Sequence, residues 1–277
     1  MNLDFLVPIA TYPDATPEEG LTRAIEMVAS VTGQISVIVQ EADIPPIDSP
    51  FAETLIDLPA LAAGAEQRSR EAGKRLQQVT RSVAERLSLP LISETARCHP
   101  GFFEDVAMRA SRQHDAALLV MDPGCPGHAS LAQAVLFGSG GPLLVCPPSG
   151  GGGHLRSVAI AWDGSRAAAR ALRDAVPLLR LASEAILLTS TEDKPIDDAS
   201  VAGVKALLDY HSIPASVIDV PLGDRLIGEV LQEAALEHKA GLLVTGAYGH
   251  NRLLEFLLGG ATRSILHRPI MPVFMSH

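Results

Sequence analysis

Short apolar runs and amphipathic stretches alternate along the whole chain. Each run, such as 158–162, contains about five or six apolar residues in succession, which is typical of strands buried on both faces of a sheet. Between the runs, apolar residues recur at helical spacing and so share one helical face. One example is the series Leu21, Ala24, Ile25 and Val28. This alternation predicts an α/β fold in which helices connect and cover parallel strands.

The order of these elements is repeated, once in each half of the chain. In the second half the pattern predicts strands at 158–162, 184–190, 215–220, 241–246 and 271–275, and helices at 165–182, 197–211, 225–238 and about 254–267. The first half has matching apolar runs at 5–10, 116–121 and 142–146, and a long helical stretch at about 61–87. Right-handed crossovers wind each set into a five-stranded parallel sheet covered on both faces. We therefore predict two tandem, Rossmann-like domains.

Four consecutive glycines, at 150–153, mark the boundary between the halves. Such a run costs too much conformational entropy inside a helix or strand, so it indicates a flexible linker. The predicted division is a first domain at 1–148, a Gly-rich linker at 149–154 and a second domain at 155–277.

Two helix starts can be read from capping residues. Thr16, Pro17 and Glu19 stand at the spacing of a capping box, with proline in the first helical position. Ser165 precedes a stretch with alanines and a leucine on one face, so we expect its hydroxyl to cap the helix there.

Composition narrows the class of protein. A chain of 277 residues is long enough for two ordinary domains, and a net charge of -10 argues against binding to nucleic acid. No stretch approaches the roughly 18 apolar residues of a membrane span, and the first residues do not resemble a signal peptide. The three cysteines form neither a zinc pattern nor a disulfide ladder. We expect a cytoplasmic protein.

The first candidate site lies where the strand at 158–162 ends. In open parallel sheets, ligands bind outside the carboxyl ends of the strands. Asp163 follows this strand directly, and a carboxylate there can accept hydrogen bonds from a ribose or from a base amino group. Taken alone, Asp163, Gly164 and Ser165 are also explained as a turn followed by a helix cap.

The second candidate site follows the strand at 241–246. Gly246 and Gly249 are followed by Gly259 and Gly260, and then by Ala261 and Thr262 at the start of a helical segment; glycines of this kind let the backbone approach a polyphosphate closely. Successive N–H groups and a helix N-terminus favour an anion, and the Thr262 hydroxyl could add a contact. Close packing is the alternative explanation for these glycines.

The spacing of Gly246, Gly249 and Gly259, together with Asp163, resembles the nucleotide-binding branch of the universal stress protein family. The element order resembles its tandem members. The resemblance implies a fold of the adenine nucleotide alpha hydrolase type and a role in stress response. It implies ATP, ADP or AMP as ligand, which Mg²⁺ could accompany. It also implies an internal pseudo-dimer of the two halves, which could pair further as a homodimer.

Carried over to this sequence, the resemblance implies that Asp163 contacts the adenosine and that the glycines and Thr262 surround the phosphates. The expected site comprises Ala161, Trp162, Asp163, Gly164, Ser165, Gly246, Gly249, His250, Asn251, Gly259, Gly260, Ala261 and Thr262. One departure is that the family has Ser or Thr directly after the third glycine, where this chain has Gly260. A hydroxyl follows two positions later.

The first half lacks these residues. Aligning Val7 with Val158 places Tyr12 opposite Asp163, and the loop after Met121 is shorter than its counterpart. We expect this half to be a structural partner, so that one chain binds one nucleotide.

An enzyme and a purely protein-binding stress module are the alternative interpretations. The chain has no G-x-S-x-G, H-E-x-x-H or P-loop motif, so we do not expect an enzyme. Slow hydrolysis of bound ATP stays open. A module for dimerisation or stress signalling that binds no nucleotide also stays open, because glycines can be present for packing alone.

Overall fold

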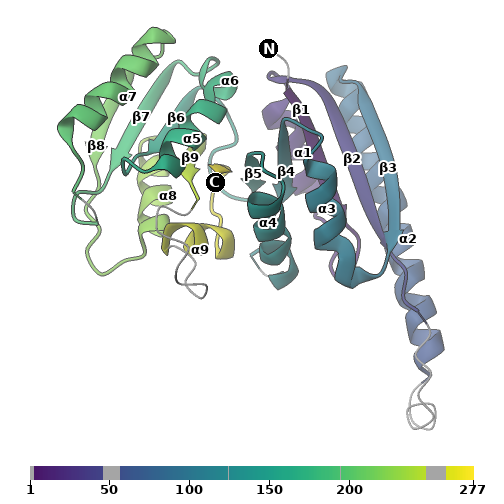
Figure 1. Cartoon of the computed structure of the whole chain (residues 1–277). Helices are drawn as coiled ribbons and strands as arrows, with labels where there is room; N and C mark the ends of the chain where they lie inside the picture. Colours follow the sequence, from purple (N-terminus) through teal and green to yellow (C-terminus); the bar gives the residue numbers. More distant parts are fainter. Residues whose placement is uncertain (1–2, 46–56, 124, 194, 248–259) are drawn as a thin grey trace.

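The computed structural model describes residues 3–45, 57–123, 125–193, 195–247 and 260–277, and over these ranges it shows a single mixed sheet with helices on both faces (Figure 1). The first half contributes the strands β1 (Leu3–Ala10), β2 (Thr32–Ala42), β3 (Leu91–Cys98), β4 (Ala116–Val120) and β5 (Leu143–Cys146). The second half contributes β6 (Ser157–Ala161), β7 (Glu184–Thr189), β8 (Ala215–Asp219), β9 (Leu242–Gly246) and β10 (Val273–Ser276). The strand order is β3-β2-β1-β4-β5-β10-β9-β6-β7-β8.

Within each half the strands are parallel, as the repeated pattern predicts, and the halves meet at an antiparallel pair formed by β5 and β10. Leu144 pairs with Phe274, and both side chains are fully buried. The flanking pairs are Leu143 with Met275 and Val145 with Val273, so exchanging the halves leaves the pairing unchanged. The sheet therefore has a pseudo-twofold axis at this seam, and the two halves form the internal pair expected from the sequence.

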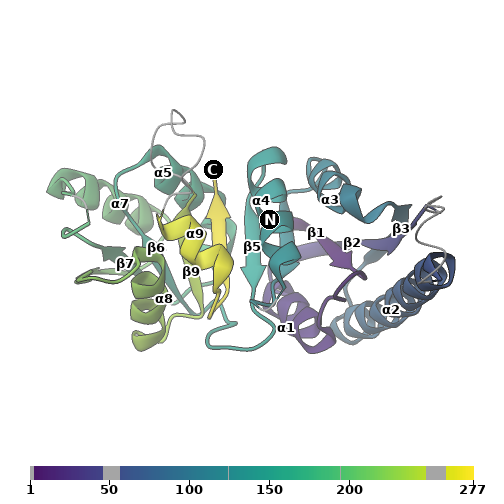
Figure 2. The ribbon, with the colours of Figure 1, turned by 90° about the horizontal axis from the view of Figure 1, so that it is seen from below.

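The helices follow the predicted order. The first half contains α1 (Glu18–Val28), α2 (Leu58–Leu87), the short 3-10 helix η1 (Pro100–Phe102), α3 (Phe103–Ser111) and α4 (Pro126–Gly138). The second half contains α5 (Arg166–Asp174), α6 (Val176–Leu179), α7 (Asp198–Tyr210), α8 (Ile227–Glu237) and α9 (Gly260–His267). In Figure 2, α1 and α2 lie on one side of the first-half strands and α3 lies on the other. None of the helices in the described ranges is long and apolar enough to cross a membrane.

Three local predictions differ in outcome. Ser165 caps α5 as expected, because its hydroxyl oxygen accepts a hydrogen bond from the backbone N–H of Ala168 at 3.1 Å. The single helix predicted at 165–182 is divided into α5 and α6 beside Pro177, which lacks the N–H that a continuous helix needs. The capping box at Thr16 is wrong, because its hydroxyl accepts a hydrogen bond from the N–H of Ala10 instead.

The glycine segment between the halves is packed against the second half. The N–H of Gly151 donates to the carbonyl of Ile270 at 3.2 Å, and the N–H of Gly153 donates to the carbonyl of Gly241 at 2.8 Å. Gly152 has a φ of 80°, and a Cβ there would lie 2.7 Å from the carbonyl oxygen of Gly241. These glycines therefore permit a close backbone approach, so the expectation of a freely flexible linker is wrong.

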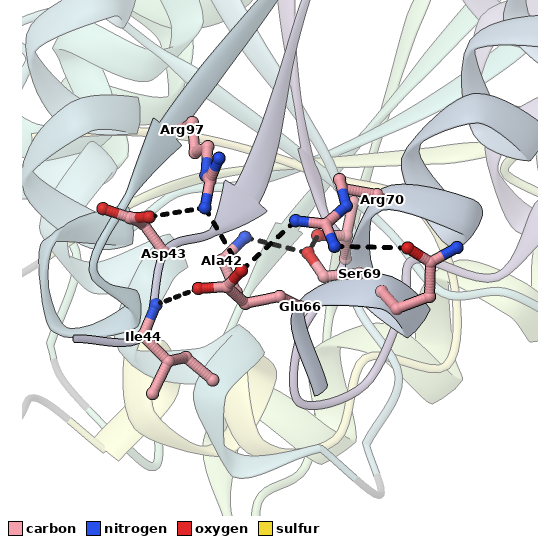
Figure 3. Close-up of polar contacts among 9 residues, drawn as sticks. Ala42, Asp43, Ile44, Glu66, Ser69, Arg70 and Arg97 are labelled. Atoms are coloured by element: carbon pink, nitrogen blue, oxygen red, sulfur yellow. Dashed lines mark hydrogen bonds and ion pairs between the residues drawn. The ribbon is translucent and has the colours of Figure 1, made fainter. Parts of the chain in front are cut away.

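A network of ion pairs attaches α2 to the ends of β2 and β3 (Figure 3). The Glu66 carboxylate accepts a hydrogen bond from the N–H of Ile44 at 2.9 Å, and it pairs with Arg70 at 3.2 Å and with Arg97 at 3.1 Å. Arg97 also pairs with Asp43 at 2.7 Å. The N–H of Ile44, followed by the two arginines, lowers the pKa of Glu66 despite partial desolvation.

Candidate functional site

A cavity of about 200 Å³ lies at the carboxyl ends of β6, β7 and β9, against α8 and the start of α9. Parallel strands end at a common edge, so loops that are distant in sequence meet there. The expected site residues that line the cavity are Ala161, Trp162, Asp163, Ser165, Gly246, Gly260, Ala261 and Thr262. Gly164 belongs to the same turn as Asp163. The positions Gly249, His250, Asn251 and Gly259 lie outside the described residues.

The turn after β6 places the Asp163 carboxylate at the cavity. One carboxylate oxygen of Asp163 accepts a hydrogen bond from the N–H of Ser165 at 2.9 Å. Gly164 has a φ of 72°, in the left-handed region that favours glycine. The turn and helix cap considered in the sequence are thus both present. A carboxylate has about four acceptor positions, so Asp163 can serve the turn and further partners together.

Trp162 forms part of the cavity wall and is the single tryptophan of the chain. Its indole N–H donates to the hydroxyl of Ser200 at 3.0 Å, which fixes the ring at the start of α7. Because the half-buried ring lines the cavity, its fluorescence is a suitable readout for a ligand that binds there.

Gly246 and Gly260, the two glycines of the second candidate site that the structure describes, differ in their surroundings. A Cβ on Gly246 would lie 2.3 Å from the nitrogen of Ala168 and 2.4 Å from the carbonyl carbon of Ala167. Gly246 is therefore required for the packing of α5 against β9. Among the described residues, a Cβ on Gly260 would meet only Ile227, at 3.9 Å. Packing against described residues accounts for the first glycine and does not account for the second.

The first turn of α9 supplies the donor side of the cavity. The first four N–H groups of a helix have no partner within the helix, and the helix dipole favours an anion at this end. Gly260 and Ala261 begin α9 and line the cavity. Thr262 lines it as well, although its side chain is almost fully buried and already interacts with a neighbour.

Comparisons with known proteins place the fold. No family model and no curated protein matches the sequence. A universal stress protein from Archaeoglobus fulgidus has a similar structure, with a TM-score of 0.66 at 16% identity over 98% of this chain and 95% of that one. A putative universal stress protein from Pseudomonas aeruginosa gives a TM-score of 0.53 at 16% identity over 99% and 93%.

The chain has the universal stress protein fold. A functionally unknown protein from Pseudomonas aeruginosa is also similar, with a TM-score of 0.55 at 14% identity over 98% of this chain and 92% of that one. Because these matches cover both chains almost completely, the likeness includes both halves of the sheet. At such low identity it shows the fold alone.

Within this universal stress protein fold, the cavity also has walls that the sequence analysis missed. They come from the end of β7, the segment after it, and α8: Leu188, Ser190, Asp193, Ile196, Ile227 and Leu231. The hydroxyl oxygen of Ser190 is buried and has no hydrogen-bond partner among the described residues. The available signal was the strand at 184–190, because the strand beside β6 in a parallel sheet must end at the same edge.

The described residues show neither a metal-binding cluster nor a disulfide. No group of three or more His, Cys, Asp or Glu side chains gathers there to hold a metal ion. Cys146 is buried and its thiol has a pKa raised by burial to about 12, whereas Cys98 and Cys125 are half-buried. All three are free thiols, and Cys146 packs in the hydrophobic core as a small apolar residue does.

Proposed function

We propose that this chain binds one adenine nucleotide in the second-half cavity and acts in stress response through its nucleotide-bound state. The supporting observation is that two segments distant in sequence line the same cavity. The turn at 161–165 and the helix start at 260–262 both lie there, at the carboxyl ends of the strands. These are the two segments that the sequence singled out separately. The likeness to universal stress protein structures supports the same proposal through the fold.

The lining suggests how the ligand would be divided along the cavity. Leu188, Ile227 and Leu231 offer apolar walls to a flat base. The Asp163 carboxylate is an acceptor for ribose hydroxyls, and the first turn of α9 offers N–H donors to phosphate oxygens. Mg²⁺ would enter with the phosphates, since this ion usually keeps several waters and binds through substrate phosphates.

We propose binding without turnover. Hydrolysis needs a group that activates water at the terminal phosphate, and the sequence contains none of the catalytic motifs that would supply one. Incubating the pure protein with ATP and measuring released phosphate tests this part separately from binding.

Asp163 is the decisive residue for testing nucleotide binding. Titration calorimetry with ATP and with AMP, followed in parallel by Trp162 fluorescence, should give close to one site per chain. Asp163→Ala should weaken both nucleotides by about tenfold or more, the effect of one or two hydrogen bonds to a charged group. Asp163→Asn keeps an oxygen for the turn to Ser165, so it separates loss of the turn from loss of the ligand contact.

The matched control is Tyr12→Ala, at the equivalent position of the first half, which should leave nucleotide affinity unchanged. Thr262→Val removes a hydroxyl and keeps the shape, and it should weaken ATP by about 0.5–1.5 kcal/mol, or up to about 3 if the partner is a phosphate oxygen. Two equivalent sites per chain would contradict the assignment to the second half alone. No binding of either nucleotide would favour a protein-binding module.

A further inference from the structure

A second cavity, of about 120 Å³, lies in the first half at the carboxyl ends of β1 and β2, against α3 and α4. The pseudo-twofold axis relates this place to the proposed nucleotide cavity. Tyr12 lines it where Asp163 lines the other, as the alignment of the two halves predicts. No ligand is expected in this half from the sequence.

Gln40 is the most unusual residue of the first-half cavity. It pairs across the sheet with Ala10, and the equivalent pair in the second half is Leu188 with Ala161, so a fully buried glutamine replaces a leucine. Its amide nitrogen donates to the carbonyl of Phe103 at 2.5 Å. A carbonyl can only accept, so the amide oxygen must point elsewhere, and it has no partner among the described residues.

His128, near the start of α4, supplies the complementary group. Its Nδ1 accepts a hydrogen bond from the N–H of Asp122 at 3.0 Å, so the proton of the neutral ring is on Nε2. Nε2 is buried and has no partner within the described ranges. Burial lowers the pKa of His128, although the nearby carboxylates of Asp122 and Asp14 oppose this, so the ring is a neutral donor at physiological pH.

The charge of the lining excludes an anionic ligand. Asp14 and Glu104 line the cavity, and its described lining residues include no lysine or arginine. A phosphate or carboxylate would meet two negative charges with no positive charge to balance them. The remaining wall is largely apolar, with Pro13, Phe103 and Leu131. This lining therefore suits an uncharged, flat molecule.

Gln40 stands on a rigid support. The Thr11 hydroxyl donates to the carbonyl of Gln40 at 2.5 Å and lies 2.6 Å from the Ser69 hydroxyl oxygen. The Ser69 hydroxyl also accepts from the N–H of Ala42 at 2.8 Å, in the network drawn in Figure 3. These buried bonds hold the backbone of Gln40 by connecting the ends of β1 and β2 to α2. The bond from its amide nitrogen to the carbonyl of Phe103 orients the side chain, so the amide of Gln40 is preorganised.

We propose that the first-half cavity binds a small uncharged molecule with both a hydrogen-bond acceptor and a hydrogen-bond donor, of the aromatic carboxamide class. The amide oxygen of the ligand accepts from His128 Nε2–H, and its N–H donates to the Gln40 side-chain oxygen. Neither protein group has a partner among the described residues, and an unpaired polar group is costly in a buried place. The ring lies against the apolar wall. The first half is then a ligand-binding domain with its own specificity.

Benzamide and benzoate are suitable probes, because they have the same shape and differ in the charge and in the N–H donor. Calorimetry on the full chain should show one benzamide site per chain, with benzoate at least about tenfold weaker. Gln40→Leu places the second-half residue at this position, and His128→Asn keeps an acceptor for the N–H of Asp122. Each should weaken benzamide about fivefold or more, with thermal stability measured alongside.

The reactivity of two cysteines can show where benzamide binds without any substitution in the protein. Cys125 lines the first-half cavity and is half-buried, whereas Cys98 is half-buried but does not line it. Benzamide should slow alkylation of Cys125 by a small thiol reagent and leave the rate at Cys98 unchanged, as resolved by mass spectrometry. Asp163→Ala should leave benzamide affinity unchanged, so this proposal stands or fails separately from nucleotide binding.

Three results would overturn the proposal. They are no benzamide binding up to its solubility limit, equal affinity for benzoate, and protection of Cys98 together with Cys125. The first would mean that ordered water, rather than a ligand, pairs with the two buried groups.

Discussion

Gly246 and Gly260 allow a direct test of whether a glycine near the second-half cavity is present for packing or for a ligand. Gly246→Ala places a methyl group 2.3 Å from the backbone nitrogen of Ala168 and 2.4 Å from the carbonyl carbon of Ala167. Backbone atoms of a helix start cannot move aside as a flexible side chain can. We expect a loss of about 1–3 kcal/mol of stability, the usual cost of overpacking.

Gly260→Ala should behave in the opposite way. Within the described part of the chain, the new methyl group meets only Ile227, at 3.9 Å, so it clashes with none of these residues. Gly260 is the first residue of α9, where the interior helix preference for alanine does not apply, so the melting temperature should stay about constant. The same methyl group stands at the N-terminus of α9, on the proposed phosphate approach. Loss of one N–H contact to a phosphate oxygen weakens ATP by about 1.5–3 kcal/mol, or roughly 10- to 150-fold.

The assay measures thermal unfolding and the affinities for ATP and adenosine in the parent and both variants. Gly246→Ala should lower the melting temperature by about 2–12 °C, from roughly 2–4 °C per kcal/mol in domains of this size. Gly260→Ala should leave the melting temperature and adenosine affinity unchanged and should weaken ATP. If Gly260→Ala binds ATP as tightly as the parent, phosphate does not lie at this helix start. If it destabilises the protein as Gly246→Ala does, the packing argument is wrong.

Two further predictions concern stability alone. Gly152→Ala should lower the free energy of unfolding by about 1–3 kcal/mol, because φ is 80° and the new Cβ lies 2.7 Å from the Gly241 carbonyl oxygen. Denaturant titration measures this change, and an unchanged midpoint would favour a free linker. The N–H of Ile44 and the neighbouring arginines lower the pKa of Glu66, so its carboxylate stabilises the fold above the ordinary glutamate pKa and loses this effect as the pH falls through the folded-state pKa. The difference in unfolding midpoint between the parent and Glu66→Gln should therefore shrink between pH 7 and about pH 3, and a constant difference would contradict this reasoning.

The sequence alone determined the order and type of the elements. Buried parallel strands need apolar residues on both faces, so runs such as 158–162 were recognisable without any tertiary information. Ser165 was recognisable as a helix cap because capping is a contact between near neighbours in the chain. The turn at Asp163 and the glycines near 246 and 260 were identified as two candidate sites, because ligands bind at the carboxyl ends of parallel strands and both segments follow such an end.

Local rules were less reliable where a distant group competed for the same atom. The Thr16 hydroxyl matched a capping box, yet it accepts a hydrogen bond from Ala10 because that strand end lies beside it in the fold. Nothing within four residues of Thr16 indicates this competitor.

Only the tertiary structure shows which distant residues contact one another. The antiparallel pair of Leu144 and Phe274 joins the halves into one sheet, and no local pattern specifies which edges meet. Gly246 has its role through the backbone of α5, and Gly152 has its role through Gly241, both distant in sequence. The sequence identified Gln40 only as part of a strand. Among the glutamines of the described ranges, Gln40 alone has a buried amide oxygen without a hydrogen-bond partner. This can be seen only in the folded structure, because hydrogen bonding depends on all the groups that surround an atom.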